Sequence, residues 1–158
     1  MTTFKRGRFS DPRDSFAART KNIGDCLIWT GSTNDSGYGR IWVRGRMESA
    51  HRFAWEQVHG PIPDGLHVDH KEHCDPACCN VEHLRLATPS QNASNRLGPQ
   101  SNNRTGIRNV SRHKNRWRVQ IYKDGKRRFN KSFDSLADAA EAAEEERNRI
   151  FGSFAGQL

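Results

Sequence analysis

One short stretch of the chain, residues 69–92, carries side chains that could perform two kinds of chemistry. The first is metal binding, because three cysteines fall within six residues and histidines lie beside them. Thiolates and imidazoles are the ligands that zinc prefers. The second is phosphodiester hydrolysis, which needs a base to deprotonate water and a hard cation to stabilise charge on the phosphate oxygens. The sequence therefore predicts two sites interleaved in one segment.

The zinc site needs four ligands in a tetrahedron. Three candidates come from the loop and the fourth comes from a strand that precedes it: Cys26, Cys74, Cys78 and His83. His73 and Cys79 compete for the same positions. Because Cys78 and Cys79 are adjacent, they cannot easily bind one ion together, and one of them is expected to be a buried thiol. Disulfides are not expected, since the N-terminus lacks the apolar core of a signal peptide.

The hydrolytic set consists of Asp69, His70 and Asn92. A neutral imidazole at His70 can act as the general base. Asn92, together with Asp69, offers the oxygen ligands that suit Mg²⁺, a cation that keeps most of its waters and asks for only one or two protein groups. These groups could serve a metal-assisted hydrolase, but an isolated Asp-His pair is weak evidence and is more often structural than catalytic.

Short elements must position these side chains. Residues 1–22 are polar and are interpreted as an arm or a short helix. Strands are predicted in four segments: 26–29, 38–43, 66–69 and 84–87. A helix is predicted over residues 50–59, with Ser49 as its N-cap and Gly60 at its end.

A second helix start follows the last of these strands. Thr88 is the expected N-cap, Pro89 the first helical residue and Gln91 the partner that completes a capping box. Asn92 should therefore lie one turn into a helix. A unit this small cannot be stabilised by apolar burial alone, so a structural metal is expected on physical grounds.

Residues 98–104 are the predicted linker, and the sequence pattern changes after them. Three strands are predicted over 106–111, 116–122 and 126–133, with Asp124-Gly125 as a tight hairpin turn. Ser135 and Asp138 open a helix that Gly152 ends. One helical face is apolar: Leu136, Ala139, Ala140, Ala143 and Ile150. We expect a three-stranded antiparallel sheet with one helix packed across it.

The second of these three strands alternates in character. Trp117, Val119 and Ile121 face one way, toward the helix, while the other face carries guanidinium and amide groups that could contact bases or phosphates. The predicted DNA-binding residues are Arg108, Arg112, Arg116, Arg118, Gln120, Tyr122, Lys126 and Arg128. A basic face that is merely solvated is the alternative interpretation.

The charge of the chain agrees with a polyanionic partner. Its formal net charge is +8 over 158 residues, and each phosphate that Lys or Arg neutralises releases counterions. No apolar stretch approaches the length of a membrane span. An intracellular protein of the cytoplasm or nucleoid is therefore predicted, with no membrane partner.

Several separated motifs closely resemble HNH endonucleases of the His-Cys-box, or His-Me finger, type. The resemblance covers about residues 15–97 and rests on CLIWTG from Cys26, GYGRI from Gly37, AHRFAW from Ala50, GPIPDG from Gly60 and the run from Val68 to Asn92. Such enzymes are often encoded by phages or mobile introns. The resemblance implies a ββα-metal fold and Mg²⁺-dependent cleavage of DNA.

The family's functional positions map onto this sequence by motif. His70 falls on the general base, Asn92 on the metal-binding Asn, and the zinc ligands on Cys26, Cys74, Cys78 and His83. Two departures are visible: His83 stands where plainer relatives have an Asn that orients the base, and Cys74 lies four rather than two residues after His70. The second departure keeps His73 as an alternative ligand.

Three arginines are candidates for the cation that such enzymes place against the product phosphate. They are Arg40, Arg46 and Arg52, and spacing does not choose among them. Arg52 is adopted for the catalytic set.

The C-terminal residues 104–156 resemble an AP2-type DNA-binding domain, which in phage and mobile-element proteins is often joined to an HNH unit. The resemblance rests on the run from Gly106 to Phe133 and on the alanine-rich helix that follows. Asn109 stands where a Gly is common, and Asn130-Lys131 replaces the usual Leu-Gly.

Taken together, the sequence predicts an α+β protein with four parts: an N-terminal arm (1–22), a zinc-stabilised ββα-metal nuclease domain (23–97), a linker (98–104) and an AP2-like domain (105–158). The predicted activity is Mg²⁺-dependent hydrolysis of double-stranded DNA, with one structural Zn²⁺. Two alternatives are a non-catalytic, zinc-stabilised DNA-binding regulator and an RNA-directed nuclease. The sequence does not choose between a monomer that nicks and a homodimer that cuts both strands.

Overall fold

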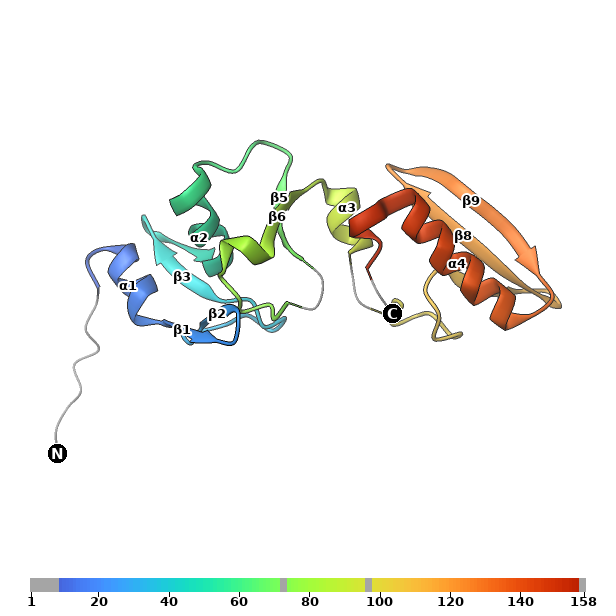
Figure 1. The fold of residues 1–158 in the computed structure, drawn as a ribbon, viewed down its shortest axis with the longest axis horizontal. Helices are drawn as coiled ribbons and strands as arrows, with labels where there is room; N and C mark the ends of the chain where they lie inside the picture. The colour runs from blue at the N-terminus through green and yellow to red at the C-terminus, as the bar shows by residue number, and fades with distance from the viewer. Residues whose placement is uncertain (1–8, 72–73, 96–97, 157–158) are drawn as a thin grey trace, which may run out of the picture. The chain divides into compact units, whose positions relative to one another are not determined.

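The computed structural model describes residues 9–71, 74–95 and 98–156 (Figure 1). The chain divides into two compact units between Leu86 and Ala87. Both units combine short helices with small antiparallel sheets, so the predicted α+β class is confirmed. No helix in the described part of the chain has the length and apolarity that a bilayer crossing requires.

The first unit is built from short hairpins around one longer helix. Its elements are α1 (Pro12–Ala18), β1 (Thr20–Ile23), β2 (Cys26–Trp29), β3 (Arg40–Val43), β4 (Arg46–Ser49), α2 (Ala50–His59), β5 (His67–His70), the 3₁₀ turn η1 (Val81–His83) and β6 (Leu84–Ala87). β1 pairs with β2, β3 with β4, and β5 with β6, each pair forming a two-stranded sheet. The final residue of β5 is His70, the predicted base.

The core of the first unit forms around Trp29. Its indole packs with Ile41 and Phe53, which are almost fully buried. Gly39 is required at this place, because a Cβ there would lie 2.6 Å from the Trp29 ring. The buried ring therefore accounts for one glycine of the Gly37-Tyr38-Gly39 segment, and it holds β3 against the helix that follows.

Strand β2 is also fixed to the cysteine-rich loop by its backbone. The Trp29 N–H donates to the Ala77 carbonyl at 2.8 Å, and the Cys79 N–H donates to Leu27 at 2.7 Å. Ile28 and Cys78 form a β-bridge between them. This pairing brings Cys26 to the loop without help from a metal.

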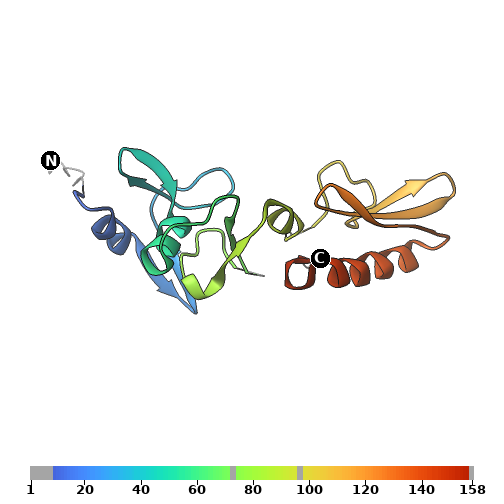
Figure 2. The same ribbon diagram turned by 90° about the horizontal axis from the view of Figure 1, so that it is seen from above.

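The second unit contains α3 (Pro89–Ser94), β7 (Val110–His113), β8 (Arg116–Lys123), β9 (Lys126–Phe133), α4 (Leu136–Phe151) and the 3₁₀ turn η2 (Gly152–Phe154). The strands form one antiparallel sheet in the order β7-β8-β9. Figure 2 shows α4, in red, running along one face of this sheet. The predicted three-stranded sheet with one helix is confirmed, whereas its assignment to the AP2 type stays a prediction.

The core of this unit lies between the sheet and α4. Val119 and Ile121 of β8 pack against Ala139 and Ala143 of α4, and all four are buried. The hairpin turn forms as expected: Asp124 and Gly125 both have positive φ, 53° and 71°, which is the two-residue turn that matches strand twist.

Several predicted boundaries differ from the structure. The strand expected over 106–111 begins only at Val110, because Asn109 has a φ of 64° and ends a turn. Asn tolerates this left-handed conformation better than most residues. The strand expected over 38–43 begins at Arg40. β1 and β4 were not predicted.

Helix caps follow the sequence closely, with one exception. Thr88 accepts a hydrogen bond from the Gln91 N–H, and the Gln91 side chain accepts one from the Thr88 N–H, so the predicted capping box of α3 is confirmed. Ser135 caps α4 as expected. Ser49 occupies the N-cap position of α2 but makes no capping hydrogen bond, so that part of the prediction is wrong.

The predicted linker, residues 98–104, lies inside the second unit. Asn103 explains why, since its amide donates to the carbonyls of Ile107 and Val110 and its oxygen accepts from Thr105. The division into compact units thus falls before α3, earlier along the chain than the predicted domain boundary. The functional domain boundaries remain a prediction.

Candidate functional site

Four side chains of the first unit converge on one point, and they are the four predicted zinc ligands. The ligand atoms of Cys26, Cys74, Cys78 and His83 all lie within 4.8 Å of one another. The His83 Nδ1 atom is 3.6 Å from the sulfur of Cys26, 3.7 Å from that of Cys74 and 3.6 Å from that of Cys78. The sulfurs of Cys26 and Cys74 are 4.0 Å apart.

These distances are those of a tetrahedral zinc site. With Zn–S bonds of about 2.3 Å and a Zn–N bond of about 2.1 Å, the edges of the tetrahedron measure about 3.8 Å between sulfurs and about 3.6 Å from sulfur to nitrogen. The cysteines are free thiols, so no disulfide competes for them. The cluster could therefore bind one zinc ion.

The two competing ligands fall outside this cluster. Cys79 is 2% exposed and its side chain joins the core around Trp29, so it is the expected buried thiol. Burial raises the pKa of Cys79 to about 12, with the neighbouring Cys78 adding to the shift. His73 lies outside the described residues. Burial likewise raises the pKa of Cys74, which means that zinc binding has to displace protons from the cluster.

His70 is held by the same loop that carries the cluster. Its Nε2 atom lies 2.9 Å from the Cys78 carbonyl oxygen. A carbonyl can only accept, so Nε2 carries the proton and the neutral ring keeps its lone pair on Nδ1. Burial lowers the pKa of His70, while the hydrogen bond to Cys78 and the charge of Asp69 oppose that shift. The imidazole is thus oriented and kept neutral, as a general base requires.

Two further rings pack beside His70 that were not predicted from the sequence. The His51 ring centroid lies 4.9 Å from that of His70, and Tyr38 lies 5.4 Å from His51 and 5.7 Å from His70. Burial lowers the pKa of His51 to about 3, and its neighbours His70 and Arg52 add to the shift. The sequence offered one signal for these residues, which is that His51 belongs to the AHRFAW motif and Tyr38 to the GYGRI motif. Their contact with His70 could not be predicted, because it forms only in the folded structure.

Asp69 has a partner that the sequence did not reveal. The Arg85 Nε atom lies 3.1 Å from the Asp69 carboxylate, and both side chains are mostly buried. The two residues sit on the paired strands β5 and β6. A buried carboxylate needs such a cation, since an uncompensated charge in the interior is strongly unfavourable. Arg85 therefore fixes the carboxylate that precedes the predicted base.

Asn92 lies in the second unit, one turn into α3 as predicted. The helix is held inside that unit at both ends. The Ser90 hydroxyl accepts from the Asp124 N–H at 3.2 Å, and the Ser94 hydroxyl donates to the Phe154 carbonyl at 3.0 Å. The predicted set is thus divided, with Asp69 and His70 in the first unit and Asn92 in the second.

The three candidate arginines are all exposed on the first unit. Arg46 forms an ion pair with Glu48 at 2.7 Å. Arg52 lies next to His51 on α2, and Arg40 opens β3. Arg52 is the one whose charge acts on the histidine pair, since it contributes to the lowered pKa of His51.

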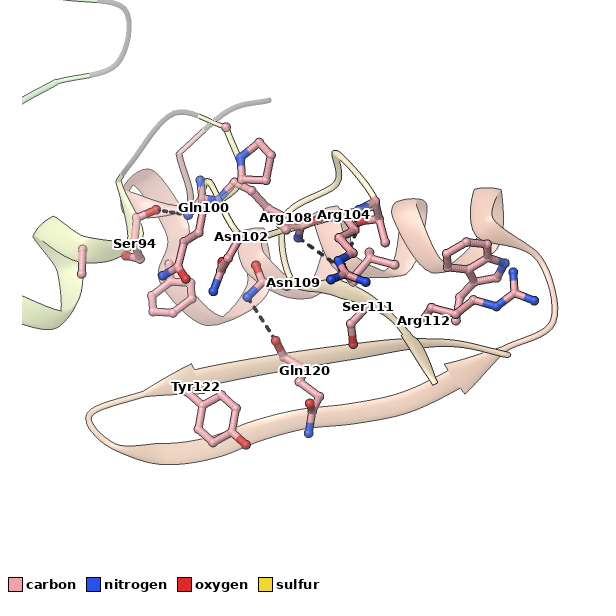
Figure 3. Close-up of a pocket in the computed structure, with 18 of the residues that line it drawn as sticks. Ser94, Gln100, Asn102, Arg104, Arg108, Asn109, Ser111, Arg112, Gln120 and Tyr122 are labelled. Carbon is pink, nitrogen blue, oxygen red and sulfur yellow. Dashed lines mark hydrogen bonds between the residues drawn. The ribbon is translucent and has the colours of Figure 1, made fainter. Parts of the chain in front are cut away.

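The second unit contains a cleft of about 1040 Å³ that is lined by both polar and apolar side chains. Figure 3 shows arginine and amide side chains around it, from the loop before β7 and from β8. The labelled residues are Ser94, Gln100, Asn102, Arg104, Arg108, Asn109, Ser111, Arg112, Gln120 and Tyr122. Ser90 and Ser94 of α3 line the same cleft. A cleft with this lining suits an anionic, hydrogen-bonding ligand.

The predicted DNA-binding residues fall into two groups. The first group is exposed and consists of Arg112, Arg116, Tyr122, Lys126 and Arg128. The guanidinium of Arg112 lies 4.8 Å from the centre of the Trp117 ring, and Arg116 forms an ion pair with Asp134 at 2.7 Å. Arg108, Arg118 and Gln120 are half-buried.

Arg108 differs most from its predicted role. Its guanidinium donates to the Ser94 carbonyl at 2.8 Å and to the Ala155 carbonyl at 3.3 Å, and its own carbonyl accepts from Arg147 at 3.3 Å. Arg147, on the apolar face of α4, is 2% exposed. Arg108 thus joins α3 to the C-terminal turn, which is a structural role in addition to the predicted one.

Comparisons with known proteins found one matching family and several viral relatives. Residues 48–94 match the HNH endonuclease family. Protein 3.8 of Escherichia phage T7 is 34% identical over 107 residues, which are 66% of this chain and 86% of that protein. The Uncharacterized HNH endonuclease L560 of Acanthamoeba polyphaga mimivirus is 33% identical over 121 residues, 76% of this chain and 62% of that protein.

Protein 7.7 of Escherichia phage T7 is 47% identical over 70 residues, or 44% of this chain. The chain spans 52% of that relative, about half of its length. No solved structure matches the chain significantly. The matched residues 48–94 contain Asp69, His70 and Asn92 together with the cysteine-rich loop.

Proposed function

Because residues 48–94 of this chain match the HNH endonuclease family, we propose that the protein catalyses Mg²⁺-dependent hydrolysis of phosphodiester bonds in double-stranded DNA. One observation carries the proposal: Cys78 supplies both a sulfur to the cluster and a carbonyl to the His70 ring. Metal binding at the cluster therefore fixes the orientation of the base.

The proposed roles follow from the geometry of each side chain. His70, neutral and with its lone pair on Nδ1, takes a proton from the attacking water. Asp69, held by Arg85, and Asn92 supply the oxygen atoms that would hold the catalytic Mg²⁺. A carboxylate and an amide oxygen are hard ligands, so the donor set fits this ion, which when bound stabilises charge on the phosphate oxygens. Arg52 is the proposed cation at the product phosphate.

The structural zinc has a separate task in this proposal. Cys26, Cys74, Cys78 and His83 would hold it, and it supplies no step of the reaction. Its ligands come from β2 and from the loop between β5 and β6. The bound ion would thus link strand β2 to the loop that orients His70.

The second unit is proposed to bind the DNA. The exposed face of its sheet and the adjacent cleft carry Arg112, Tyr122 and Arg128, groups that can contact phosphates and base edges. The resemblance to AP2-type domains supports this role. The net charge of +8 adds attraction to any nucleic acid, in a manner that salt should weaken.

The experiment is plasmid cleavage by the purified, zinc-loaded chain. Supercoiled DNA incubated with Mg²⁺ should give nicked or linear product, and the same mixture without Mg²⁺ should give none. DNA that is bound but never cut, with any divalent cation, would instead identify a zinc-stabilised DNA-binding regulator. Cleavage of duplex RNA in preference to DNA would show that the substrate class is wrong.

A further inference from the structure

The outer face of the β3–β4 hairpin exposes two large apolar side chains that the proposed function has not used. Trp42 is 52% exposed and Met47 is 38% exposed. The strand register places them directly opposite each other. Most tryptophan side chains are largely buried, as Trp29 is here at 4%. A paired tryptophan and methionine on the surface therefore calls for a partner.

The hairpin is firmly supported from its other face. Ile41 and Val43 alternate with Trp42 along β3, and both are buried in the core around Trp29. Because side chains of a strand alternate between its faces, this anchoring fixes Trp42 on the outside. The exposed pair is thus carried on a rigid ribbon and not on a loop.

Positive charge surrounds the pair. Arg40 lies two residues before Trp42 on the same face, and Arg44 stands at the hairpin tip, where its φ is 46°. Both are exposed. Arg46 is not part of this set, because the register pairs it with Val43 on the other face, where it shares an ion pair with Glu48. A flat aromatic side chain between guanidinium groups has the composition of a surface that contacts nucleic acid.

We propose that this hairpin face is a second DNA contact of the protein, separate from the C-terminal sheet. Trp42 and Met47 lie against the sugars and base edges of a duplex, while Arg40 and Arg44 pair with its phosphates. A two-stranded ribbon has the width to enter the major groove. The inference rests on the proposed function, because it takes the substrate to be double-stranded DNA.

A second copy of the chain is a weaker candidate for the occupant. A stable protein interface buries upward of about 1,000 Å² and is depleted of charge at its centre. The hairpin offers two apolar side chains with arginines on either side. Repulsion between identical basic faces would oppose their association, whereas the phosphates of DNA complement them.

The test is duplex binding in a His70→Ala background, in which cleavage cannot deplete the DNA. Binding of a fluorescent duplex is measured by anisotropy with Mg²⁺ and zinc present. Trp42→Ala should weaken binding by about tenfold, because it removes the apolar contact of the indole with the sugars and base edges. Arg44→Ala should lower the slope of log affinity against log salt by about one.

The matched control is Val58→Ala, which removes another exposed apolar side chain, 63% exposed on α2. It should bind the duplex as tightly as the parent. Thermal unfolding checks that Trp42→Ala folds, and Trp42→Phe, which keeps a flat ring, should recover part of the affinity.

Two outcomes would overturn the inference. One is unchanged duplex affinity of Trp42→Ala; the other is a Trp42-dependent change in sedimentation mass without DNA, which would assign the face to a second copy. Neither outcome is confused with failure of the proposed function, which shows itself as wild-type protein that binds DNA but does not cut it.

Discussion

At the scale of single residues, the site depends on what holds each functional group rather than on the groups alone. His70 is oriented by the Cys78 carbonyl and packed against His51, and Asp69 is held by Arg85. The sequence predicted His70 and Asp69, because both stand in a motif. It could not predict Arg85 or the packing of His51, because those contacts form only when strands pair and helices pack.

The ion pair of Arg85 with Asp69 gives the first prediction. Arg85→Ala leaves a buried carboxylate without its cation and should lower the free energy of unfolding by about 3–5 kcal/mol. The matched control is Arg46→Ala, which breaks an exposed ion pair and should change stability by about 1 kcal/mol or less. Urea denaturation of the zinc-loaded proteins measures both. Equal effects of the two substitutions would show that the Asp69 pair is not a buried one.

The protonation state of His70 gives the second prediction. Burial lowers the pKa of His70 below its ordinary value of 6.5. A general base acts in its neutral form, so the cleavage rate should rise with pH through this pKa and level off on the alkaline side. Initial nicking rates from about pH 5 to 8 at saturating Mg²⁺ measure the profile. A midpoint well above 6.5 would exclude His70 as the base in this environment.

At the scale of elements, the cluster and α3 are held by different means. The cluster is positioned by backbone pairing between β2 and the loop, and bound zinc is proposed to stabilise it. α3 rests on hydrogen bonds from its two ends into the second unit. Loss of zinc should therefore disturb the first unit and leave the second intact.

Adjacent cysteines allow a sharp test of the zinc assignment. Cys78→Ala should lose bound zinc, cleavage and thermal stability of the first unit, because it removes a ligand and disturbs the carbonyl that orients His70. Cys79→Ala should retain zinc, since its sulfur lies in the core. Metal content and circular dichroism report the difference. Zinc retained by Cys78→Ala and lost from Cys79→Ala would reverse the assignment.

Substitutions of Arg108 and Arg128 can distinguish a structural role from a role in DNA binding in the second unit. Arg108→Ala removes two hydrogen bonds to carbonyls and should destabilise the unit by about 1.5–3 kcal/mol. Arg128→Ala, at an exposed position, should weaken DNA binding and leave stability unchanged. Thermal unfolding and duplex affinity of both variants provide the comparison. An unchanged melting temperature for Arg108→Ala would show that the Arg108 side chain does not stabilise the unit.

Local signals explain which elements could be predicted. The capping box of Thr88 and Gln91 and the Asp124-Gly125 turn are encoded by neighbouring residues, and both form as predicted. Strands β1 and β4 are largely polar, so they lack the alternating pattern that identifies a strand, and only their pairing with β2 and β3 defines them. Burial of Arg147 in α4 was hidden for a similar reason, since charge in a helix normally indicates an exposed face.

At the scale of the whole molecule, the two units have different proposed functions. The first carries the cluster and His70, the second carries the basic sheet and α3 with Asn92. Their combined charge of +8 favours association with DNA, and the hairpin face adds a proposed contact on the first unit. Whether the product is nicked or fully cut depends on how many active sites reach the duplex at once.

The most direct measurement of the central claim compares wild-type protein with His70→Ala on supercoiled plasmid in the presence of Mg²⁺. The variant should retain zinc, its circular dichroism spectrum and its affinity for duplex DNA, because the His70 ring is bonded to the backbone carbonyl of Cys78 and not to the sulfur of that residue. It should lose cleavage by at least about a hundredfold, the contribution expected of a general base. A folded His70→Ala protein that cuts plasmid as fast as wild type would contradict the account.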